Sequence, residues 1–261
     1  GQTQTLRDIF EGNHEISNDI INSNKPMIII GESLLRLDSS EFLFNKTKEF
    51  LIKNNKISDD WNSLNILSGD AATVGNFDLG IISNQNNLLN DLKEHKFDII
   101  YLVGQDCLNF DKRDEFIIYQ GSHGDKGAEY ADIILPGSAY TEQDGYFTNL
   151  EGKVQKAYKA SYPPGEAKED WLIINELAEY MNNRKLFNDK DELESSMFNY
   201  LNLQKEKQNN VLNNSTKEFQ SQKLIINVKD YYFSNVIARS SKTMIECNNS
   251  KINFKFTGTE G

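Results

Sequence analysis

A series of short apolar runs, each ended by a glycine, a proline or a polar residue, constrains this chain more than any other feature. Runs of this length without hydrophobic–polar alternation are typical of β-strands buried on both faces, as in parallel sheets. Stretches with helical spacing lie between them, and strands that alternate with helices predict a layered α/β domain with a mainly parallel sheet. The predicted strands are Met27–Gly31, Leu64–Leu67, Asp98–Gly104, Phe116–Gln120 and Ala131–Pro136.

The predicted helices fill the gaps between these strands and follow the last of them. The clearest one carries Glu169 and Asp170 in its first turn, where carboxylates complement the helix dipole. It also carries a stripe that we expect to face the core, made of Trp171, Ile174, Ala178 and Met181. The helices are a lead-in within residues 1–24, a helix after Ser39 and Ser40, a short helix at Leu88–Leu92 and a helix over Ala167–Met181.

Ligands of parallel α/β folds bind beyond the carboxyl ends of the strands, where the following loops meet at one edge of the sheet. The loops after Gly31, Gly104 and Gln120 each follow a predicted strand directly. We therefore expect these three loops to share one edge, and any pocket of the chain to lie there.

The character of the sequence changes twice along the chain, which predicts three segments. Residues 1–181 hold the strands and clear helices and predict the α/β domain. Residues 182–223 are rich in Asn, Gln, Lys and Glu, as expected of a polar helix and linker with partial disorder. Residues 224–261 open with the apolar and aromatic stretch Leu224–Phe233 and predict a docking segment, with a helix near Ser234 and a loose tail.

The composition excludes several classes of protein. The formal net charge is −11 without a sustained basic run, which argues against binding to nucleic acid or to an anionic membrane surface. The apolar runs are far too short to span a bilayer, so a soluble protein is predicted. The sequence has two cysteines, Cys107 and Cys247, too few to ligate a zinc ion or an iron–sulfur cluster alone; free thiols are predicted rather than a disulfide.

The most distinctive stretch runs from Ile118 to Gln155, and it begins with a glycine loop. Gly121, Gly124 and Gly127 follow a predicted strand. Such a loop either offers backbone N–H groups to an anion or is a tight turn in which glycine supplies positive φ. The spacing matches neither GxGxxG nor a P-loop and favours the turn. His123 is interpreted as a capping or core hydrogen-bond partner in preference to a general base, because no nucleophile motif accompanies it.

The second half of this stretch holds carboxylates and turn residues. Asp132, just before a predicted strand, is placed to fix neighbouring backbone amides, and Asn149–Gly152 predicts a tight turn. Glu142 and Glu151 would suit acid–base work as a pair. Nothing in the sequence fixes their separation, so this pairing is the less favoured interpretation.

Two segments of the chain together resemble the molybdopterin-oxidoreductase-like region of the 75 kDa iron–sulfur subunit of respiratory complex I, called the G subunit in bacteria. They are YQGSHGDKGAEYADIILPGSAYTEQDGYFTNLEGKVQ and the later YPPGEAKEDWLIINELAEYM. The forms HGDKGAEYADIILPGSAYTE and PPGEAKEDW resemble its mitochondrial and alphaproteobacterial branch. Lys229–Cys247 resembles the C-terminal element of that subunit. The pattern ADIILPG…E…G…N.EG also occurs across molybdopterin oxidoreductases, so the resemblance implies their α/β fold with a C-terminal helical extension.

The chain departs from that subunit in two respects. The subunit has a ferredoxin-like region whose cysteines and one histidine ligate iron–sulfur clusters, and this sequence contains no counterpart of it. We expect either a subunit split between two chains or its C-terminal portion alone, and a start at Gly1 rather than Met agrees with processing or a fragment. Lys153 stands where the motif has Arg, and ammonium is a weaker partner for an anion than a bidentate guanidinium.

The resemblance implies a structural chain. In complex I this region is a relic of cofactor-binding relatives, so no catalytic residue, cofactor or metal is expected here, and the iron–sulfur clusters are expected in a partner chain or a missing N-terminal part. The implied partners are other peripheral-arm subunits, at the matrix side of the mitochondrial inner membrane or the cytoplasmic side of a bacterial one, without nucleic acid or membrane insertion. The relic motif positions, expected to be structural, are Gly121, His123, Gly124, Asp132, Pro136, Gly137, Glu142, Asn149, Glu151 and Gly152.

Three functions follow, in order of preference. The first is a structural part of the peripheral arm of complex I, which supports electron transfer from NADH to quinone without carrying a cluster. The second is an active molybdopterin oxidoreductase or a piece of one, with Gly121–Gly127 and Asn149–Lys153 touching the cofactor; the third is a free nucleotide-binding module. In the first case we expect Tyr231, Tyr232 and Phe233 to be buried against the α/β body or a neighbouring subunit.

Overall fold

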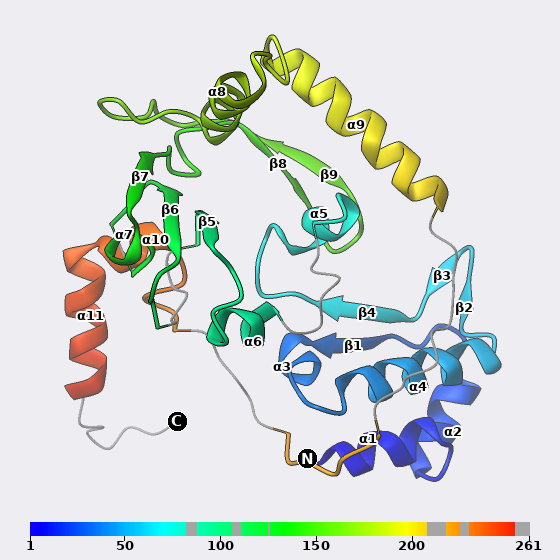
Figure 1. Cartoon of the computed structure of the whole chain (residues 1–261). Helices are drawn as coiled ribbons and strands as arrows, with labels where there is room; N and C mark the ends of the chain where they lie inside the picture. Colours follow the sequence, from blue (N-terminus) through cyan, green and yellow to red (C-terminus); the bar gives the residue numbers. More distant parts are fainter. Residues whose placement is uncertain (82–87, 106–110, 125, 208–217, 225–229, 254–261) are drawn as a thin grey trace. The chain divides into compact units, whose positions relative to one another are not determined.

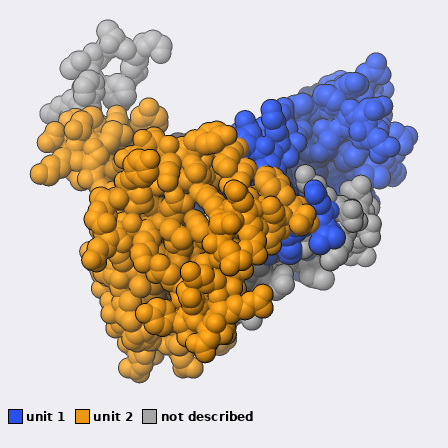
Figure 2. All heavy atoms as spheres, turned by 90° about the horizontal axis from the view of Figure 1, so that it is seen from above, with its two compact units in different colours: residues 1–81, 147–155, 200–227 blue, residues 82–146, 156–199, 228–261 orange. Residues whose placement is uncertain are grey.

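The computed structural model describes residues 1–81, 88–105, 111–124, 126–207, 218–224 and 230–253 (Figure 1). The chain divides into two compact units, each assembled from segments far apart in the sequence (Figure 2). Unit 1 comprises Gly1–Ile81, Phe147–Gln155 and Tyr200–Asn227, and unit 2 comprises Ile82–Tyr146, Lys156–Asn199 and Val228–Gly261. The three segments predicted from sequence character, with boundaries at residues 181 and 223, stay a prediction.

Unit 1 combines helices with a small parallel sheet. Its elements within residues 1–81 are α1 (Thr3–Phe10), α2 (Glu15–Asn22), β1 (Ile28–Gly31), α3 (Glu32–Leu35), α4 (Ser40–Lys53), β2 (Ile57–Ser58), β3 (Trp61–Asn62), β4 (Leu64–Leu67) and α5 (Thr73–Asp78). β1 and β4 run parallel, with Ile28 opposite Leu64, and β2 pairs antiparallel with β3. α4 buries Leu43 and Leu51 completely, so this helix supplies much of the core of unit 1.

Unit 2 is built on a parallel sheet with the strand order β5–β6–β7. Its elements are α6 (Leu88–Lys93), β5 (Ile99–Val103), β6 (Phe116–Gly121), α7 (Lys126–Tyr130), β7 (Ile133–Pro136), α8 (Asp170–Asn182), α10 (Val236–Ser240) and α11 (Lys242–Asn253). Leu102, Ile117 and Tyr119 form a buried cluster on one face of the sheet, and Ala128 and Tyr130 of α7 pack against it. The predicted α/β fold with parallel sheets and C-terminal helices is therefore confirmed.

The division between the units falls inside three further elements. β8 (Gly145–Thr148) and β9 (Val154–Ala157) form a two-stranded sheet, and α9 (Lys190–Lys207) is the helix expected in the polar segment. None of the described helices combines the length and the apolar character that a bilayer crossing requires.

The prediction that the strands are buried on both faces is wrong for alternate residues. Ile29 of β1 is 58% exposed, and Ile99 of β5 is 64% exposed. Successive side chains of a strand point to opposite faces, and only the alternate residues Ile100 and Leu102 of β5 contribute to the cluster beside α7. The apolar runs therefore locate the strands correctly, but they overstate the burial, because the described residues bury only one face of each of these strands.

The predicted core stripe of α8 is wrong for two of its four residues, because Trp171 and Ala178 are half-buried but Ile174 and Met181 are not. Ile174 and Met181 are 40% and 74% exposed, whereas Ile173 and Asn175 are buried. The Asn175 side chain accepts the backbone N–H groups of Leu186 and Phe187 at 2.8 and 3.0 Å. Because this amide fixes the chain that returns after the helix, a polar residue faces inward and the helix is rotated from the orientation that hydrophobicity alone predicts.

Two buried hydroxyls fix the segment 218–224 to the helices of unit 1. The Thr3 Oγ1 accepts the Gln222 N–H at 2.7 Å and donates to the Gln220 carbonyl at 3.0 Å. The Ser39 Oγ accepts the Gln220 N–H at 2.8 Å and donates to the same carbonyl at 2.7 Å. Both hydroxyl residues are fully buried. No local sequence signal connects positions this far apart.

A Thr3→Val variant tests this connection. Valine keeps the shape of threonine but leaves the Gln222 N–H without its acceptor, which costs about 1–3 kcal/mol of unfolding free energy. Urea denaturation of Thr3→Val and of the exposed control Thr5→Val on the same helix measures the effect, and the control should stay within about 0.5 kcal/mol of the unmodified chain. Equal stability of both variants would contradict the assigned role of Thr3.

In unit 2 a histidine–carboxylate contact joins the end of α6 to the start of β6. His95 has a left-handed backbone (φ +55°), and its Nδ1 contacts the Glu115 Oε1. The Glu115 residue is 5% exposed, and its Oε2 accepts the Arg113 N–H at 2.7 Å. That backbone donor, followed by His95, lowers the pKa of Glu115 from its ordinary 4.5 to about 2.

The depressed pKa makes stability fall with acid. The stabilisation by ionised Glu115 is fully present above about pH 4.5 and is lost progressively as the pH falls towards 2. The difference in unfolding free energy between the unmodified chain and Glu115→Gln should therefore shrink over this window in urea titrations. Glu166→Gln, at an exposed position, is the control. A Glu115→Gln difference that is independent of pH would show that the carboxylate charge does not stabilise this contact.

Candidate functional site

The strongest candidate site lies at the carboxyl edge of the β5–β6–β7 sheet. The strands run parallel, so their following loops meet at this edge. The Gly104 N–H donates to the Gln120 carbonyl at 2.8 Å, and the Gly137 N–H donates to the Gly121 carbonyl at 3.0 Å. The predicted common edge is confirmed for the loops after Gly104 and Gln120. For the loop after Gly31, which ends β1 in unit 1, it stays a prediction.

A chain of four polar side chains crosses this edge. The Tyr101 hydroxyl donates to the Gln120 Oε1 at 2.5 Å, and the Gln120 Nε2 donates to the Asp170 Oδ1 at 2.7 Å. The Asp170 Oδ2 accepts from the Gln143 Nε2 at 2.8 Å, and the Gln143 Oε1 accepts the Asp170 N–H at 3.1 Å. Burial, and then the charge of Asp170, raise the pKa of Tyr101. We call these four residues the Asp170 network; it fixes the first residue of α8 against the end of β6.

Tyr119 determines the packing of the glycine loop after β6. Its residue is 2% exposed, and its hydroxyl donates to the His123 carbonyl at 3.0 Å. A Cβ atom at Gly121 would collide with this hydroxyl, and one at Gly127 would lie 2.8 Å from the ring and 2.7 Å from the Gln105 carbonyl. Neither glycine has positive φ, so the predicted reason for these glycines is wrong. They permit close packing around one aromatic ring.

The imidazole of His123 has a local partner. Its Nδ1 lies 2.9 Å from the Oγ of Ser122, and the two side chains form a hydrogen bond within the loop. The preferred prediction for His123, a structural hydrogen bond, agrees with this geometry.

Asp132 fixes backbone, as predicted from its place before a strand. Its Oδ2 accepts the Ile117 N–H at 2.8 Å, and its own N–H donates to the Ile117 carbonyl at 2.8 Å. Its Oδ1 pairs with the Lys112 ammonium at 2.7 Å. The backbone donor and then Lys112 lower the pKa of this carboxyl. The residue thereby holds β6 and β7 in register where β7 begins.

The later motif residues also have local structural contacts. The Glu142 Oε2 accepts the Ala139 N–H at 2.9 Å. The Asn149 Oδ1 accepts the N–H groups of Glu151 and Lys153 at 3.0 and 2.9 Å, and Gly152 takes φ +79°. The predicted tight turn is confirmed, and it joins β8 to β9. The acid–base pairing of Glu142 with Glu151 gains no support from these contacts.

A cavity of about 190 Å³ opens at the sheet edge beside the Asp170 network. The Ser138 residue in its wall is 6% exposed, and its hydroxyl has no hydrogen-bond partner among the described residues. Tyr140 in the wall is 54% exposed, so the cavity is open to solvent beside it. The remaining lining residues are Gly104, Tyr119, Gly121, Ser122, Gln143, Asp170 and Val236.

The predicted sheet edge is the right place for this cavity, because Gly104, Gly121 and Ser122 line it, but the sequence alone does not indicate its other polar groups. The sequence pattern relates Asp170 only to the helix dipole. It does not reveal the hydrogen bond with Gln120, because the two residues are 50 positions apart. No sequence spacing connects Ser138 and Tyr101 with Asp170. The available signal is the polar run from Ser138 to Asp144, which directly follows a predicted strand at the edge where ligands bind.

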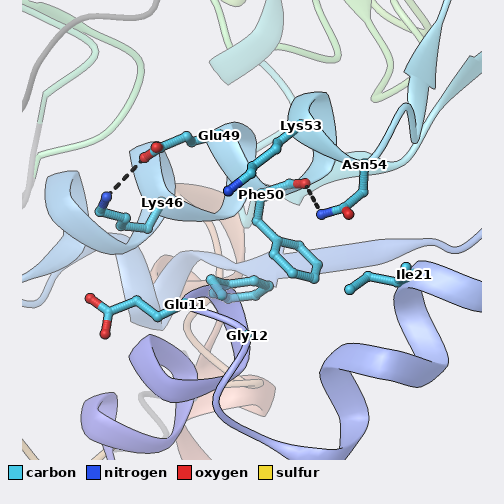
Figure 3. A pocket seen from close by; sticks show the side chains of 9 residues that line it. Glu11, Gly12, Ile21, Lys46, Glu49, Phe50, Lys53 and Asn54 are labelled. Atoms are coloured by element: carbon cyan, nitrogen blue, oxygen red, sulfur yellow. Dashed lines mark hydrogen bonds and ion pairs between the residues drawn. The ribbon is translucent and has the colours of Figure 1, made fainter.

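Unit 1 has a second cavity, of about 340 Å³, between the turn that joins α1 to α2 and the second half of α4 (Figure 3). Phe10 packs edge-on against Phe50 there, with ring centroids 5.9 Å apart. Lys46 and Glu49 at its border form an ion pair at 2.9 Å. The distinctive stretch Ile118–Gln155 contributes no residue to this cavity.

Within the part of the chain that the structure describes, no three His, Cys, Asp or Glu side chains are grouped as metal ligands. Cys247 is exposed and forms no disulfide with another described residue. The prediction for Cys107 lies outside the described residues.

The chain belongs to the molybdopterin oxidoreductase family, because the profile described as "Molybdopterin oxidoreductase" matches residues 2–180. A second profile, for the C-terminal part of the G subunit of NADH-ubiquinone oxidoreductase, matches residues 192–247. The two matches cover the sheets of both units, α10 and the first half of α11.

Individual relatives carry names that agree with the second profile. The NADH-ubiquinone oxidoreductase 75 kDa subunit of Reclinomonas americana is 35% identical over 93% of this chain, and the G subunit of the NADH-quinone oxidoreductase of Rickettsia bellii is 35% identical over 94%. The NADH-ubiquinone oxidoreductase 78 kDa subunit of Candida albicans is 37% identical over 86%. The chain spans 37%, 36% and 33% of the lengths of these three proteins.

The contrast between two glycines tests the packing around Tyr119. Gly127→Ala should lower the unfolding free energy by about 1–3 kcal/mol, because the new methyl group meets backbone and a buried ring. Gly124→Ala, where a Cβ has nothing within 4 Å, is the matched control and should change stability by less than about 0.5 kcal/mol. Chemical denaturation measures both, and equal effects would contradict the packing role of Gly127.

Proposed function

We propose that this chain is a structural part of the peripheral arm of respiratory complex I, which supports electron transfer from NADH to quinone without carrying a cluster itself. The observation that carries this proposal is the extent of the sequence similarity. The alignment with the NADH-ubiquinone oxidoreductase 75 kDa subunit of Reclinomonas americana covers 93% of this chain. In addition, residues 192–247 match the profile for the C-terminal part of the G subunit.

The chemistry of the sheet edge supports a role without the pterin cofactor after which the family is named. Molybdopterin carries a phosphate group, which requires cationic or backbone N–H partners. The cavity here is lined by the carboxylate of Asp170 and by no lysine, arginine or histidine among the described residues. The glycine loop beside it packs against the ring of Tyr119 at Gly121 and Gly127. These residues do not fit the cofactor, and we assign no catalytic step to them.

The iron–sulfur clusters of the proposed complex lie in another chain, or in a part of the subunit beyond this sequence. A cluster normally takes four protein ligands, and the sequence has two cysteines. The principal partner in this proposal is therefore the polypeptide that carries the cluster-binding cysteines.

Exposed apolar surface supports a place inside an assembly. Ile99, Val103, Phe116 and Ile133 are 43–64% exposed, and register and strand alternation place them on the same face of the β5–β6–β7 sheet. Parallel sheets are normally covered on both faces. Tyr231 is 78% exposed, so its expected burial against the α/β body is wrong, and burial against a neighbouring subunit is the remaining alternative.

The proposed location follows from that assembly. The chain would lie at the matrix side of the mitochondrial inner membrane, or at the cytoplasmic side of a bacterial one, held there by its partners. The exposed sheet face and the exposed Tyr231 are the surfaces that we propose to be covered in the complex.

Affinity purification of the chain from its own cells in mild detergent tests the proposal. We expect it to bring down a complex that oxidises NADH, together with a cysteine-rich chain whose clusters give electron paramagnetic resonance signals. Metal analysis of the purified chain itself should find less than stoichiometric molybdenum and tungsten. Stoichiometric molybdenum or tungsten, or a chain recovered without any NADH-oxidising partner, would overturn the proposal.

The aromatic segment at residues 231–233 provides a second test. Substitution of Tyr231, Tyr232 and Phe233 by serine should reduce recovery of the complex several-fold, because the exposed ring of Tyr231 and its neighbours would no longer contact a partner. The control is Tyr180→Ser, at a residue that is 89% exposed on α8. Equal recovery for both variants on native gels would exclude this segment as an assembly contact.

A further inference from the structure

We propose that the cavity at the carboxyl edge of the β5–β6–β7 sheet binds an organic cation, an ammonium or guanidinium group on a slim stem. The site would be a binding site in addition to the proposed function, and it does not depend on that function. Three features of the cavity support it: a carboxylate that forms no ion pair with a described residue, a buried hydroxyl without a partner among the described residues and an aromatic wall.

The carboxylate of Asp170 gives the cavity its charge. Each of its oxygens accepts one amide hydrogen, from Gln120 at 2.7 Å and from Gln143 at 2.8 Å. A carboxylate offers about four acceptor positions, so about two remain unused. Asp170 takes part in no ion pair with another described residue: the nearby Lys168 pairs with Glu176 at 2.7 Å. A neutral donor network therefore orients a negative charge that no cation of the described chain neutralises.

The hydroxyl of Ser138 is the second feature. The residue is 6% exposed, lines the cavity, and its oxygen has no hydrogen-bond partner within the described ranges. A buried polar atom left without a partner destabilises the folded state, so native proteins seldom retain one unless a water or a ligand satisfies it. A donor placed in the cavity would satisfy this oxygen and Asp170 together.

The walls and the size of the cavity select the class of ligand. The rings of Tyr119 and Tyr140 line it, and cations are attracted to the faces of such rings. The volume of about 190 Å³ exceeds what a bare metal ion or one water fills, and it is far smaller than a dinucleotide requires. An anion would face the carboxylate of Asp170. A small organic cation fits the charge, the hydroxyl and the walls.

The same group can come from two sources, a free small amine or an arginine or lysine side chain of a partner protein. Both present several N–H donors on an aliphatic stem, and the chemistry of recognition is shared. The experiment therefore includes a probe for each source.

Titrations of the isotopically labelled full chain, followed by nuclear magnetic resonance, test the proposal. The probes are n-propylguanidinium chloride, its neutral analogue n-propylurea, and the peptide acetyl-Gly-Arg-Gly-amide, all at constant ionic strength adjusted with sodium chloride. We expect saturable shifts of the Gly121, Ser138 and Tyr140 amides with n-propylguanidinium and no saturation with n-propylurea. Tighter binding of the peptide than of n-propylguanidinium would identify a protein side chain as the source, and exclusion of the peptide would identify a free amine.

Two variants separate the site from the fold. Ser138→Ala removes a hydroxyl without a partner in the described structure, so its melting temperature should not fall, while binding of n-propylguanidinium should weaken about tenfold. Asp170→Asn should abolish saturable binding, and Ser161→Ala, at an exposed serine, is the matched control. The proposal is overturned if n-propylguanidinium gives no saturable shifts, if n-propylurea binds equally well, or if Ser138→Ala binds like the control. The first of these results would mean that the cavity holds water only, and the other two would mean that it does not select a cation through Ser138 and Asp170.

Discussion

The arrangement of unit 2 depends on the hydrogen bonds that join Asp170 to Gln120 and Gln143. They connect the end of a central strand, the loop after β7 and the first residue of α8, three segments that lie far apart in the sequence. Gly137 is part of the same constraint, because a Cβ there would lie 2.9 Å from the Asp170 Oδ1. Buried polar networks of this kind lose most of their value when one member is removed, since the remaining groups are left without partners. The polar groups of this network thus help to set the position of α8.

A set of ion pairs continues this constraint beyond the start of α8. Glu169, which precedes the helix, pairs with Lys159 at 3.1 Å and with Lys190 at 2.9 Å, and Lys190 also reaches Asp144 at 3.4 Å. The Tyr146 hydroxyl and the Lys156 ammonium both contact Glu194 of α9. Single pairs at a surface contribute little, but charges that share partners restrain several segments at once. In this chain, residues of the family motif and residues outside it together hold the start of α8 and α9 against residues 144–159.

The sequence predicts β1, β4, β5, β6 and β7 and the sheet edge at which the cavity lies, but it predicts neither β2, β3, β8 and β9 nor the polar groups of the site. The apolar runs located the strands because strand formation is encoded locally, and the turn at Asn149–Gly152 was predictable for the same reason. The prediction for the inward face of α8 is partly wrong because the Asn175 side chain binds the backbone of Leu186 and Phe187, 11 and 12 positions further along. Hydrophobic periodicity does not encode such a contact. The polar groups of the cavity are not predicted, because Ser138, Asp170 and Gln143 acquire their roles only when distant segments meet. Asp132 was found because its partners are the strands on either side of it.

The contact between Thr3 and Gln222 spans 219 residues and determines when unit 1 can be completed during synthesis. A ribosome produces the chain from the N-terminus, so α1 and α4 emerge long before the segment that covers Thr3 and Ser39. Until Gln222 has left the ribosome, these two buried hydroxyls lack the hydrogen-bond partners that they have in the folded chain, and unit 1 cannot complete its folding. Contacts between residues so far apart in the sequence form slowly, and until they form, the uncovered surface of unit 1 is prone to aggregation. Early release from the ribosome, by truncation before Gln220, would therefore leave an unfinished unit 1 rather than a shorter stable one.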